Sequence, residues 1–355
     1  MKRDDSLTSK ALAVTEAGPT PPPTFVLQRG NPTSPGAVVE PAFLQVLSPP
    51  PPNIAPPATG KSSGRRTALA NWIASGENQL TARVMANRVW QRHFGRGLVR
   101  SSSNFGFQGD APTHPALLDW LAAEFVERGW SLKAMHRVVL TSNAYRMSSR
   151  PDPAALKSDP QNDLLSHFDM RRLAAEEIRD SVLAVSGTLN DKMYGRGIYV
   201  DIPPEVLAGQ SRPGSGWGKS PPEEQARRSI YIHVKRSLIT PILASFDAAE
   251  TDHSVSVRFA STQPTQALGM LNSRFINEQA AELAERVRRE SGEDVAPQVR
   301  LALYLVTSRP PSEAEVQRGV KLIGSLREQD GVSPAVALTS FCLLALNLNE
   351  FLYLD

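Results

Sequence analysis

The amino-acid sequence predicts a mainly α-helical protein, with a helical bundle-like body, a small two-stranded β element and a Pro-rich N-terminal arm. Beyond residue 64, apolar residues recur mostly every three or four positions, which is the period of a helix with one buried face. The 29 prolines are clustered, most densely within residues 1–64, so they mark extended segments rather than helix interiors. With 41% hydrophobic residues in 355, the chain can build a substantial core.

Four segments follow from these patterns. Residues 1–64 are expected to be a partly disordered Pro-rich arm or linker, in which TFVLQRGNPTSPG forms a short strand and turns. Residues 65–190 form an N-terminal helical bundle, and residues 191–228 a Gly/Pro-rich excursion at the surface. Residues 229–355 supply the β element and the C-terminal helices, and we expect them to pack with 65–190 as one body.

Helix boundaries in the bundle can be placed from capping residues. Thr81 is expected to cap the helix LTARVMANRVWQRHF, and Ser131 to cap the helix that contains Met135 and Val139. Gly187 stands where the helix RRLAAEEIRDSVLAVS should end. Aromatic filling of the core is expected from four tryptophans: Trp72, Trp90, Trp120 and Trp130.

The C-terminal half combines strand and helix signals. SIYIHV and SVSVRF alternate apolar with polar residues, so they are expected to pair as two strands across a long loop. Farther on, Ser312 and Glu315 have the spacing of a capping box directly after two prolines, which predicts the start of a helix.

Charge and composition exclude several classes of protein. The net charge of +3 is too slight to require a polyanion, and no nucleic-acid-binding module is recognisable, so no nucleic-acid partner is expected. The single cysteine, Cys342, lies in an apolar run and is expected to be a buried thiol. No stretch is long and apolar enough to span a membrane, and the first residues lack the apolar segment of a signal peptide.

Six stretches in order resemble a known family. They are ENQLTARVMANRVWQRHFGRGLV, NFGFQGDAPTHPALLDWLAAEFVERGWSLKAMHR, RRLAAEEIRDSVLAVSG, RRSIYIHVKR, QPTQALGMLN and LNLNEFLYLD. The chain is similar to the planctomycete-type C-terminal domain called domain of unknown function 1553, from about residue 10 to its end. The resemblance implies no activity. It implies an exported protein with upstream domains, often including a cytochrome c-like one, of which this chain would be a fragment.

Two residues are candidates for acid/base chemistry. His114 precedes Pro115 and is expected at the N-cap of a helix, where the dipole favours a neutral ring that could cap, ligate a metal or act as a base. Glu176 belongs to a group of charged residues at helical spacing: Arg172, Glu176, Arg179 and Asp180. A ladder of ion pairs is the simpler interpretation. Alternatively, Arg172 and Glu176 hold another segment, with Arg228 or Lys235 as partners, or line a polar cleft.

Ligand-binding candidates are Arg88, Arg92, Arg172, Trp217 and Arg228. Arg88 and Arg92 lie one turn apart on a basic stripe that could bind phosphate or sulfate, although a solvated helix face with snorkelling side chains is the favoured interpretation. Trp217 could stack on a sugar ring or a partner surface, or be buried against the helices.

No cofactor or metal site is expected. The histidines lack the spacing of zinc motifs, and the absence of C-x-x-C-H excludes covalent haem. GSGWGKS is not a nucleotide-binding loop, because Pro213 occupies the position of its first glycine and two prolines follow.

Three functional hypotheses remain. The first is a noncatalytic binding or scaffold module of a larger exported protein, whose partners are its upstream domains or a separate protein. It requires Arg172, Glu176 and Arg228 to pair with one another or with backbone. The second is a hydrolase acting on complex or anionic polysaccharide, with His114 and Glu176 as acid/base candidates. The third is a docking accessory for a c-type cytochrome.

Overall fold

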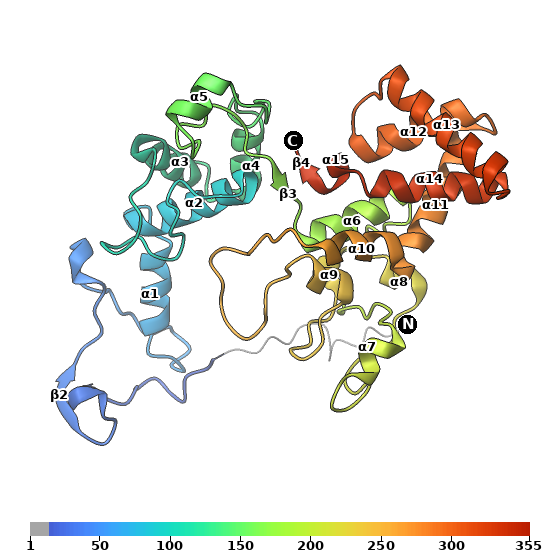
Figure 1. The fold of residues 1–355 in the computed structure, drawn as a ribbon. Coiled ribbons are helices and arrows are strands. Elements are labelled where there is room, and N and C mark those ends of the chain that lie inside the picture. Colours follow the sequence, from blue (N-terminus) through green and yellow to red (C-terminus); the bar gives the residue numbers. More distant parts are fainter. Residues whose placement is uncertain (1–13) are drawn as a thin grey trace. The chain divides into compact units, whose positions relative to one another are not determined.

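The computed structural model describes residues 14–355 and is mainly α-helical (Figure 1). These residues form fifteen α-helices, three short 3₁₀ helices and two antiparallel two-stranded sheets. The mainly α fold class with small β elements is thereby confirmed. The first part of the predicted arm, residues 1–13, lies outside the described range.

Contacts divide the chain into an N-terminal unit, which ends at Tyr145, and a C-terminal unit, Arg146–Asp355. The boundary lies inside residues 65–190, the segment that the sequence grouped as one bundle. That this segment and residues 229–355 pack as one body stays a prediction.

The N-terminal unit is built around α2, which packs against both α3 and α4. Its helices are α1 (Arg65–Ile73), α2 (Gln79–Phe94), α3 (Pro115–Glu127) and α4 (Leu132–Leu140). Trp90 is buried and stacks on Phe94, with ring centroids 4.0 Å apart. The expectation that Trp120 fills the core is wrong, because it is 50% exposed. It lies two residues from the buried Leu118, and therefore on the opposite side of α3.

Most of the expected helix ends are confirmed. Ser131 accepts a hydrogen bond from the Ala134 N–H, and Ser312 forms the capping box with Glu315. Gly187 ends its helix in the left-handed conformation, with φ of 82°. The expectation for Thr81 is wrong: Asn78 caps α2 by accepting from the N–H groups of residues 80 and 81. Thr81 is thus a donor in the first turn.

The described part of the arm contains the expected short strand. Strand β1 (Thr24–Leu27) pairs antiparallel with β2 (Pro35–Val39), and the 3₁₀ helices η1 (Gln28–Gly30) and η2 (Gln45–Leu47) follow each strand. Glu16 ties the arm to the start of α1, because its carboxylate accepts a 2.6 Å hydrogen bond from the Ser63 N–H and pairs with Arg66 at 3.2 Å.

Helix α11 (Arg274–Ser291) is central to the C-terminal unit and packs against α6 (Ala175–Ser186) and α14 (Pro334–Leu346). Helices α12 (Val295–Thr307) and α13 (Glu313–Gln329) complete this group. Cys342 is fully buried there, as expected, and burial raises the pKa of its thiol to about 12. The short elements are β3 (Arg171–Arg172), β4 (Tyr353–Leu354), α5 (Pro153–Ser158), α7 (Pro204–Ala208), α8 (Pro222–Gln225), η3 (Ser229–Tyr231), α9 (Pro241–Ser245), α10 (Pro264–Asn272) and α15 (Asn349–Leu352).

Helix α13 approaches its neighbours most closely at Gly319. A Cβ atom built on this glycine would stand 2.6 Å from Cγ1 of Val299 on α12 and 2.8 Å from Cε2 of Phe341 on α14. Both separations are shorter than carbon atoms tolerate, so the packing of three helices depends on the missing side chain.

The expected pairing of SIYIHV with SVSVRF is wrong. Ser229–Tyr231 form the 3₁₀ helix η3, because the Asp180 carboxylate takes the Ser229 N–H that a strand ladder would use. Residues 254–259 form no strand and include a bend, and Arg258 within them binds Glu176 instead. The β pairing near α6 is between β3 and β4, which joins the segment before α6 to the C-terminal residues.

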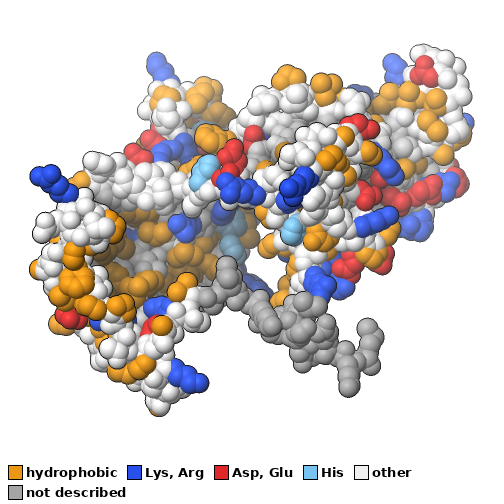
Figure 2. Space-filling model, turned by 90° about the horizontal axis from the view of Figure 1, so that it is seen from below, with side chains coloured by type: hydrophobic (Ala, Val, Ile, Leu, Met, Phe, Trp, Pro, Cys, Tyr) orange, Lys and Arg blue, Asp and Glu red, His pale blue; other side chains and the backbone are white. Residues whose placement is uncertain are grey.

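Charges of both signs are mixed on the surface. Figure 2 shows basic and acidic side chains next to one another over the C-terminal unit. Ion pairs in this unit include Arg309–Glu350 (2.8 Å). Among residues 14–355, no helix is both long enough and apolar enough to cross a membrane.

Candidate functional site

The charged residues of α6 and of the strand before it make their strong contacts with other segments rather than along the helix. This differs from the predicted ladder of ion pairs, of which an Arg179–Asp180 contact of 3.8 Å remains. Helical spacing predicts that these residues share one face of the helix. Partners from other segments compete with neighbours one turn away for the same charged groups. Arg172 and Glu176 therefore hold loop 248–260, whereas Arg179 and Asp180 hold residues 225–229.

Arg172 closes the long loop 248–260. Its side chain is 6% exposed and donates to the backbone oxygens of Phe246 (3.1 Å) and Ser261 (2.5 Å) and to the Asp247 carboxylate (2.8 Å). Asp247 also accepts from the N–H (2.9 Å) and the hydroxyl (2.8 Å) of Ser261. The two ends of loop 248–260 are thus bound to one buried guanidinium.

The stability of this closure should depend on pH. Burial raises the pKa of Asp247, but hydrogen bonds from Arg172 and Ser261 outweigh it and hold this pKa below its ordinary value. The contribution of the ionised Asp247 carboxylate to the free energy of unfolding is then complete above the unfolded pKa of about 3.9. It is lost as the pH falls through the lower folded pKa. We expect the difference in free energy of unfolding between wild type and Asp247→Asn to shrink from pH 6 to pH 3. Urea unfolding at each pH measures it, and a constant difference would contradict the assignment.

Glu176 is paired with Arg258 inside loop 248–260. Two hydrogen bonds join them, from Nη1 to Oε2 (2.6 Å) and from Nη2 to Oε1 (3.0 Å), so both carboxylate oxygens accept from the same guanidinium. The two side chains are each about one third exposed. This bidentate geometry is the strongest form of an arginine–carboxylate contact, and it fixes the loop against α6.

Arg179 is buried and holds the backbone before η3. Its guanidinium donates to the carbonyl oxygens of Gln225 (2.5 Å) and Arg227 (3.0 Å) and to the Ser229 hydroxyl (3.2 Å). Burial lowers the pKa of Arg179 to about 10, although the neighbouring Asp180 charge raises it, so the group stays protonated at neutral pH. It carries a full positive charge into the interior, where carbonyl oxygens solvate it.

Arg227 and Arg228 have opposite environments. Arg228, the candidate from the sequence, is 59% exposed and approaches the Asp180 carboxylate at 3.6 Å. Arg227 is 1% exposed and lies 3.9 Å from the Tyr231 ring centroid. It donates to three carbonyl oxygens of the excursion, those of residues 192, 194 and 196. Arg227 therefore organises the Gly/Pro-rich segment, and Arg228 extends outward beside it.

His114 occupies the N-cap of α3, with Pro115 at the first helical position, as expected. Its side chain makes no capping hydrogen bond, and its Nδ1 lies 3.1 Å from the Thr113 hydroxyl. His114 belongs to the N-terminal unit and Glu176 to the C-terminal unit.

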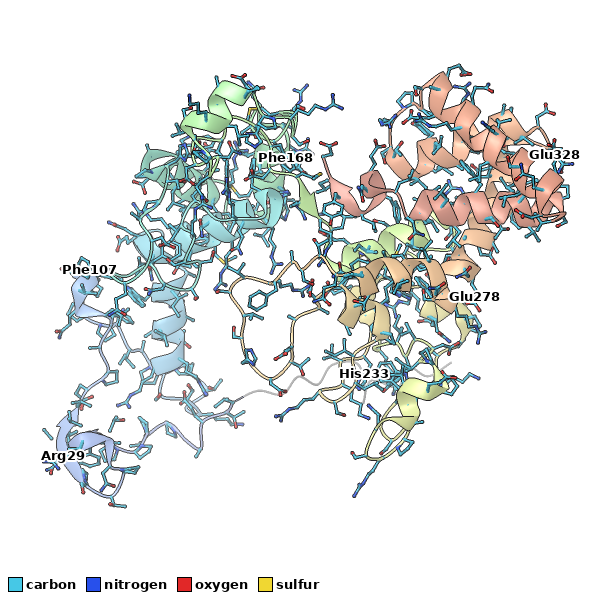
Figure 3. The ribbon with its side chains drawn as sticks, in the orientation of Figure 1. Arg29, Phe107, Phe168, His233, Glu278 and Glu328 are labelled. Atoms are coloured by element: carbon cyan, nitrogen blue, oxygen red, sulfur yellow. The ribbon has the colours of Figure 1, made fainter. Side chains whose placement is uncertain are left out.

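Arg88 and Arg92 lie on the exposed face of α2, in the N-terminal unit. On the loop before α3, in the same unit, Phe107 is fully exposed (Figure 3). The other three ligand-binding candidates, Arg172, Trp217 and Arg228, belong to the C-terminal unit.

Trp217 is half-buried and anchors the glycine-rich loop 212–218. Its Nε1–H donates to the Val200 carbonyl (3.0 Å), and its ring meets Tyr199 edge to face, with centroids 5.5 Å apart. His233, labelled in Figure 3, stacks obliquely on Tyr199 at 4.8 Å. Burial against the unit, one of the two alternatives for Trp217, is what its contacts support.

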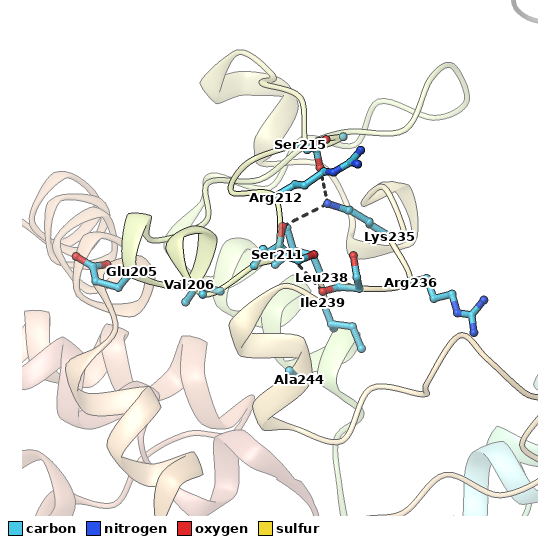
Figure 4. Close-up of a pocket in the computed structure, with 14 residues that line it drawn as sticks. Glu205, Val206, Ser211, Arg212, Ser215, Lys235, Arg236, Leu238, Ile239 and Ala244 are labelled. Atoms are coloured by element: carbon cyan, nitrogen blue, oxygen red, sulfur yellow. Dashed lines mark hydrogen bonds between the residues drawn. The ribbon is translucent and has the colours of Figure 1, made fainter.

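An open cleft of about 960 Å³ lies beside this loop (Figure 4). Its walls come from α7 and the residues after it, from loop 212–218, and from residues 235–239. Lys235 points from one wall toward the opposite loop, where its ammonium donates to the Gln210 side-chain oxygen (3.3 Å) and the Ser215 carbonyl. Arg212, Arg236 and Glu205 are the other charged lining residues.

Sequence reasoning missed several residues that build this unit. The sequence offers Lys235 as a partner for Arg172 and Glu176, yet it lines the cleft instead. Asp247 carried no signal, because its partners lie 14 and 75 residues away. Arg227 and Arg228 are adjacent, and nothing in the sequence separates the buried Arg227 from Arg228, the exposed candidate. Among residues 14–355, no three His, Cys, Asp or Glu side chains gather as a metal set.

Comparison with known proteins gives a family and no activity. No curated protein and no solved structure matches the chain significantly. The profile of the family described as protein of unknown function (DUF1553) matches residues 65–323, which is more than half of the chain and agrees with the resemblance seen in the motifs. The chain therefore belongs to the DUF1553 family.

Proposed function

We propose that this chain is a noncatalytic binding module that holds a polysaccharide in the cleft of its C-terminal unit. The supporting observation is a division of roles among its charged residues. The residues that made a catalytic site conceivable, Arg172 and Glu176, are engaged in closing loop 248–260. The cleft is instead lined by serine hydroxyls and the Lys235 ammonium, which are groups that bind sugar hydroxyls, while the Gln210 amide joins Ser237 and Lys235.

The arrangement of carboxylates supports binding without hydrolysis. Most glycoside hydrolases need two carboxyl groups about 5–10 Å apart, one on each side of the scissile bond. The residues that line the cleft include one carboxylate, Glu205. Both oxygens of Glu176 already accept from Arg258, so protonating a leaving group would require breaking an ion pair that fixes a loop.

A combined retention and turnover assay tests the proposal. The full chain is run in gels that contain neutral or anionic polysaccharides, and the same polymers are assayed for new reducing ends. We expect retarded migration with at least one polymer and no release above the heat-denatured control. Glu176→Gln and His114→Ala should be retarded like the wild type. Reducing ends that disappear in Glu176→Gln would establish the hydrolase instead, and the lack of retardation by any polymer would overturn polysaccharide binding.

A further inference from the structure

Lys235 places a positive charge in the cleft that no carboxylate neutralises among the described residues. Its two hydrogen bonds go to an amide oxygen and a carbonyl oxygen, which fix the position of the ammonium group but leave its charge. An ammonium has three N–H donors, so one remains for a ligand. Because the acceptors of Lys235 are uncharged, its ammonium favours a ligand with a negative charge at this point of the cleft.

Loop 212–218 is shaped to hold this lysine. Gly214 and Gly216 have φ of 69° and 70°, a left-handed conformation that costs glycine little. Through these turns the Ser215 carbonyl faces Lys235, and a Cβ on Gly216 would lie 3.8 Å from the lysine Cε. Gly218 lies so close to Tyr199 that a Cβ would stand 2.7 Å from its ring. With Trp217 anchored on Val200, the loop is a fixed wall.

Two arginines extend the positive character of the cleft. The Arg212 side chain is exposed on the same loop, and its guanidinium makes no hydrogen bond or ion pair within residues 14–355, although its carbonyl oxygen accepts from the Ser215 N–H (3.1 Å). Arg236 extends away from Lys235 (Figure 4) and pairs with Asp252 at 2.6 Å, so its charge is already balanced. Among the charged lining residues, Lys235 and Arg212 on opposite walls and the carboxylate Glu205 then make no described ion pair, which leaves a net positive charge in the cleft.

The rest of the lining indicates which kind of anion fits. The cleft lining includes the polar side chains of Gln210, Ser211 and Ser237. It also includes the apolar side chains of Leu238 and Ile239. None of the lining side chains is aromatic, whereas single-stranded nucleic acids are held chiefly by stacking of bases on aromatic rings. Hydroxyl-rich chains that carry charged groups match hydrogen-bonding walls with spaced cations.

We infer that the cleft recognises the sulfate or carboxylate groups of an anionic polysaccharide, with Lys235 and Arg212 as the residues that bind them. This inference rests on the proposed function and adds the ligand class and the two contacts. Lys235 would donate its remaining N–H to an oxyanion in the cleft, and Arg212 would bind a second charged group of the same polymer at the rim.

Binding of labelled polymers to the full chain tests this inference. The probes are dextran sulfate, polygalacturonate and neutral dextran of similar length, together with an oligodeoxythymidylate, and fluorescence anisotropy gives the Kd. The variants are Lys235→Gln and Arg212→Gln, with Arg88→Gln as a control that removes the same charge from the N-terminal unit. Arg212→Gln breaks no contact in the described structure, so it remains informative if Lys235→Gln fails to fold.

We expect dextran sulfate or polygalacturonate to bind and neutral dextran not to bind. Each cleft variant should weaken binding by tenfold or more, and Arg88→Gln by less than twofold. Equal binding of neutral dextran would overturn anion recognition and leave the proposed function intact. Equal weakening by all three variants would remove the cleft as the site. Tighter binding of the oligonucleotide, lost in Arg212→Gln, would replace the ligand class. If no polysaccharide binds to the wild type, the proposed function fails too.

Discussion

Replacing Arg179 by methionine should destabilise the C-terminal unit by about 3–5 kcal/mol. The substitution removes a buried guanidinium and leaves the oxygen atoms that accept its hydrogen bonds without a donor. The carbonyl oxygens of Gln225 and Arg227 both accept from this guanidinium, the first in a part-buried and the second in a buried hydrogen bond. Methionine keeps most of the volume, so the loss comes from unsatisfied acceptors rather than from a cavity. Chemical denaturation followed by circular dichroism measures the change.

The matched control for this substitution is Arg228→Met, one residue from a carbonyl that Arg179 holds. Arg228 is largely exposed and touches only the edge of the same network, through Asp180. We expect the stability of Arg228→Met to stay close to that of the wild type, because exposed ion pairs contribute little to the free energy of unfolding. Hydrogen exchange adds a local readout: residues 190–200 and 222–232 should exchange faster in Arg179→Met. Equal stability of the two variants would show that the buried guanidinium is not needed.

Two glycines of α13 should respond to alanine with opposite signs. Gly319→Ala is expected to lower the free energy of unfolding by about 1–3 kcal/mol, because the new methyl group overlaps Val299 and Phe341. Gly324→Ala adds the same group to the same helix where no atom lies within 4 Å, so it should stabilise by about 0.5–1 kcal/mol through helix propensity.

The pair separates packing from backbone effects, since both substitutions change the chain entropy in the same way. Thermal unfolding of the full chain gives both signs in one experiment. If Gly319→Ala is stabilising as well, the helices of the C-terminal unit have room to move apart, and the close approach at Gly319 is not a constraint on the fold.

Local signals predicted the helices well, because each is short-range. The caps at Ser131 and Ser312 and the end at Gly187 depend on residues within one turn. SIYIHV failed for the opposite reason. Its alternation is that of a strand, but Asp180, 49 residues earlier, captures the Ser229 N–H, and no periodicity within the segment records that contact.

The candidate site shows the same limit more strongly. The spacing of Arg172 and Glu176 indicated one charged face, and the structure sends them to partners 75 and 82 residues away. Lys235 becomes a cleft residue only because Gly214 and Gly216 bend a distant loop over it. A motif such as GSGWGKS can be rejected as a phosphate loop from its prolines alone. That it forms a wall beside a lysine is a property of the folded chain.

The clamp at Asp247 and Ser261 makes the connection between α9 and α10 tolerant of added sequence. Because its two ends are held by Arg172 whatever lies between them, the helices on either side do not depend on the number of intervening residues. Doubling the length of such a connection costs only about 0.6 kcal/mol in closure entropy. Loop 248–260 is therefore a place where an epitope or a fluorescent reporter can be inserted while the helical packing is preserved.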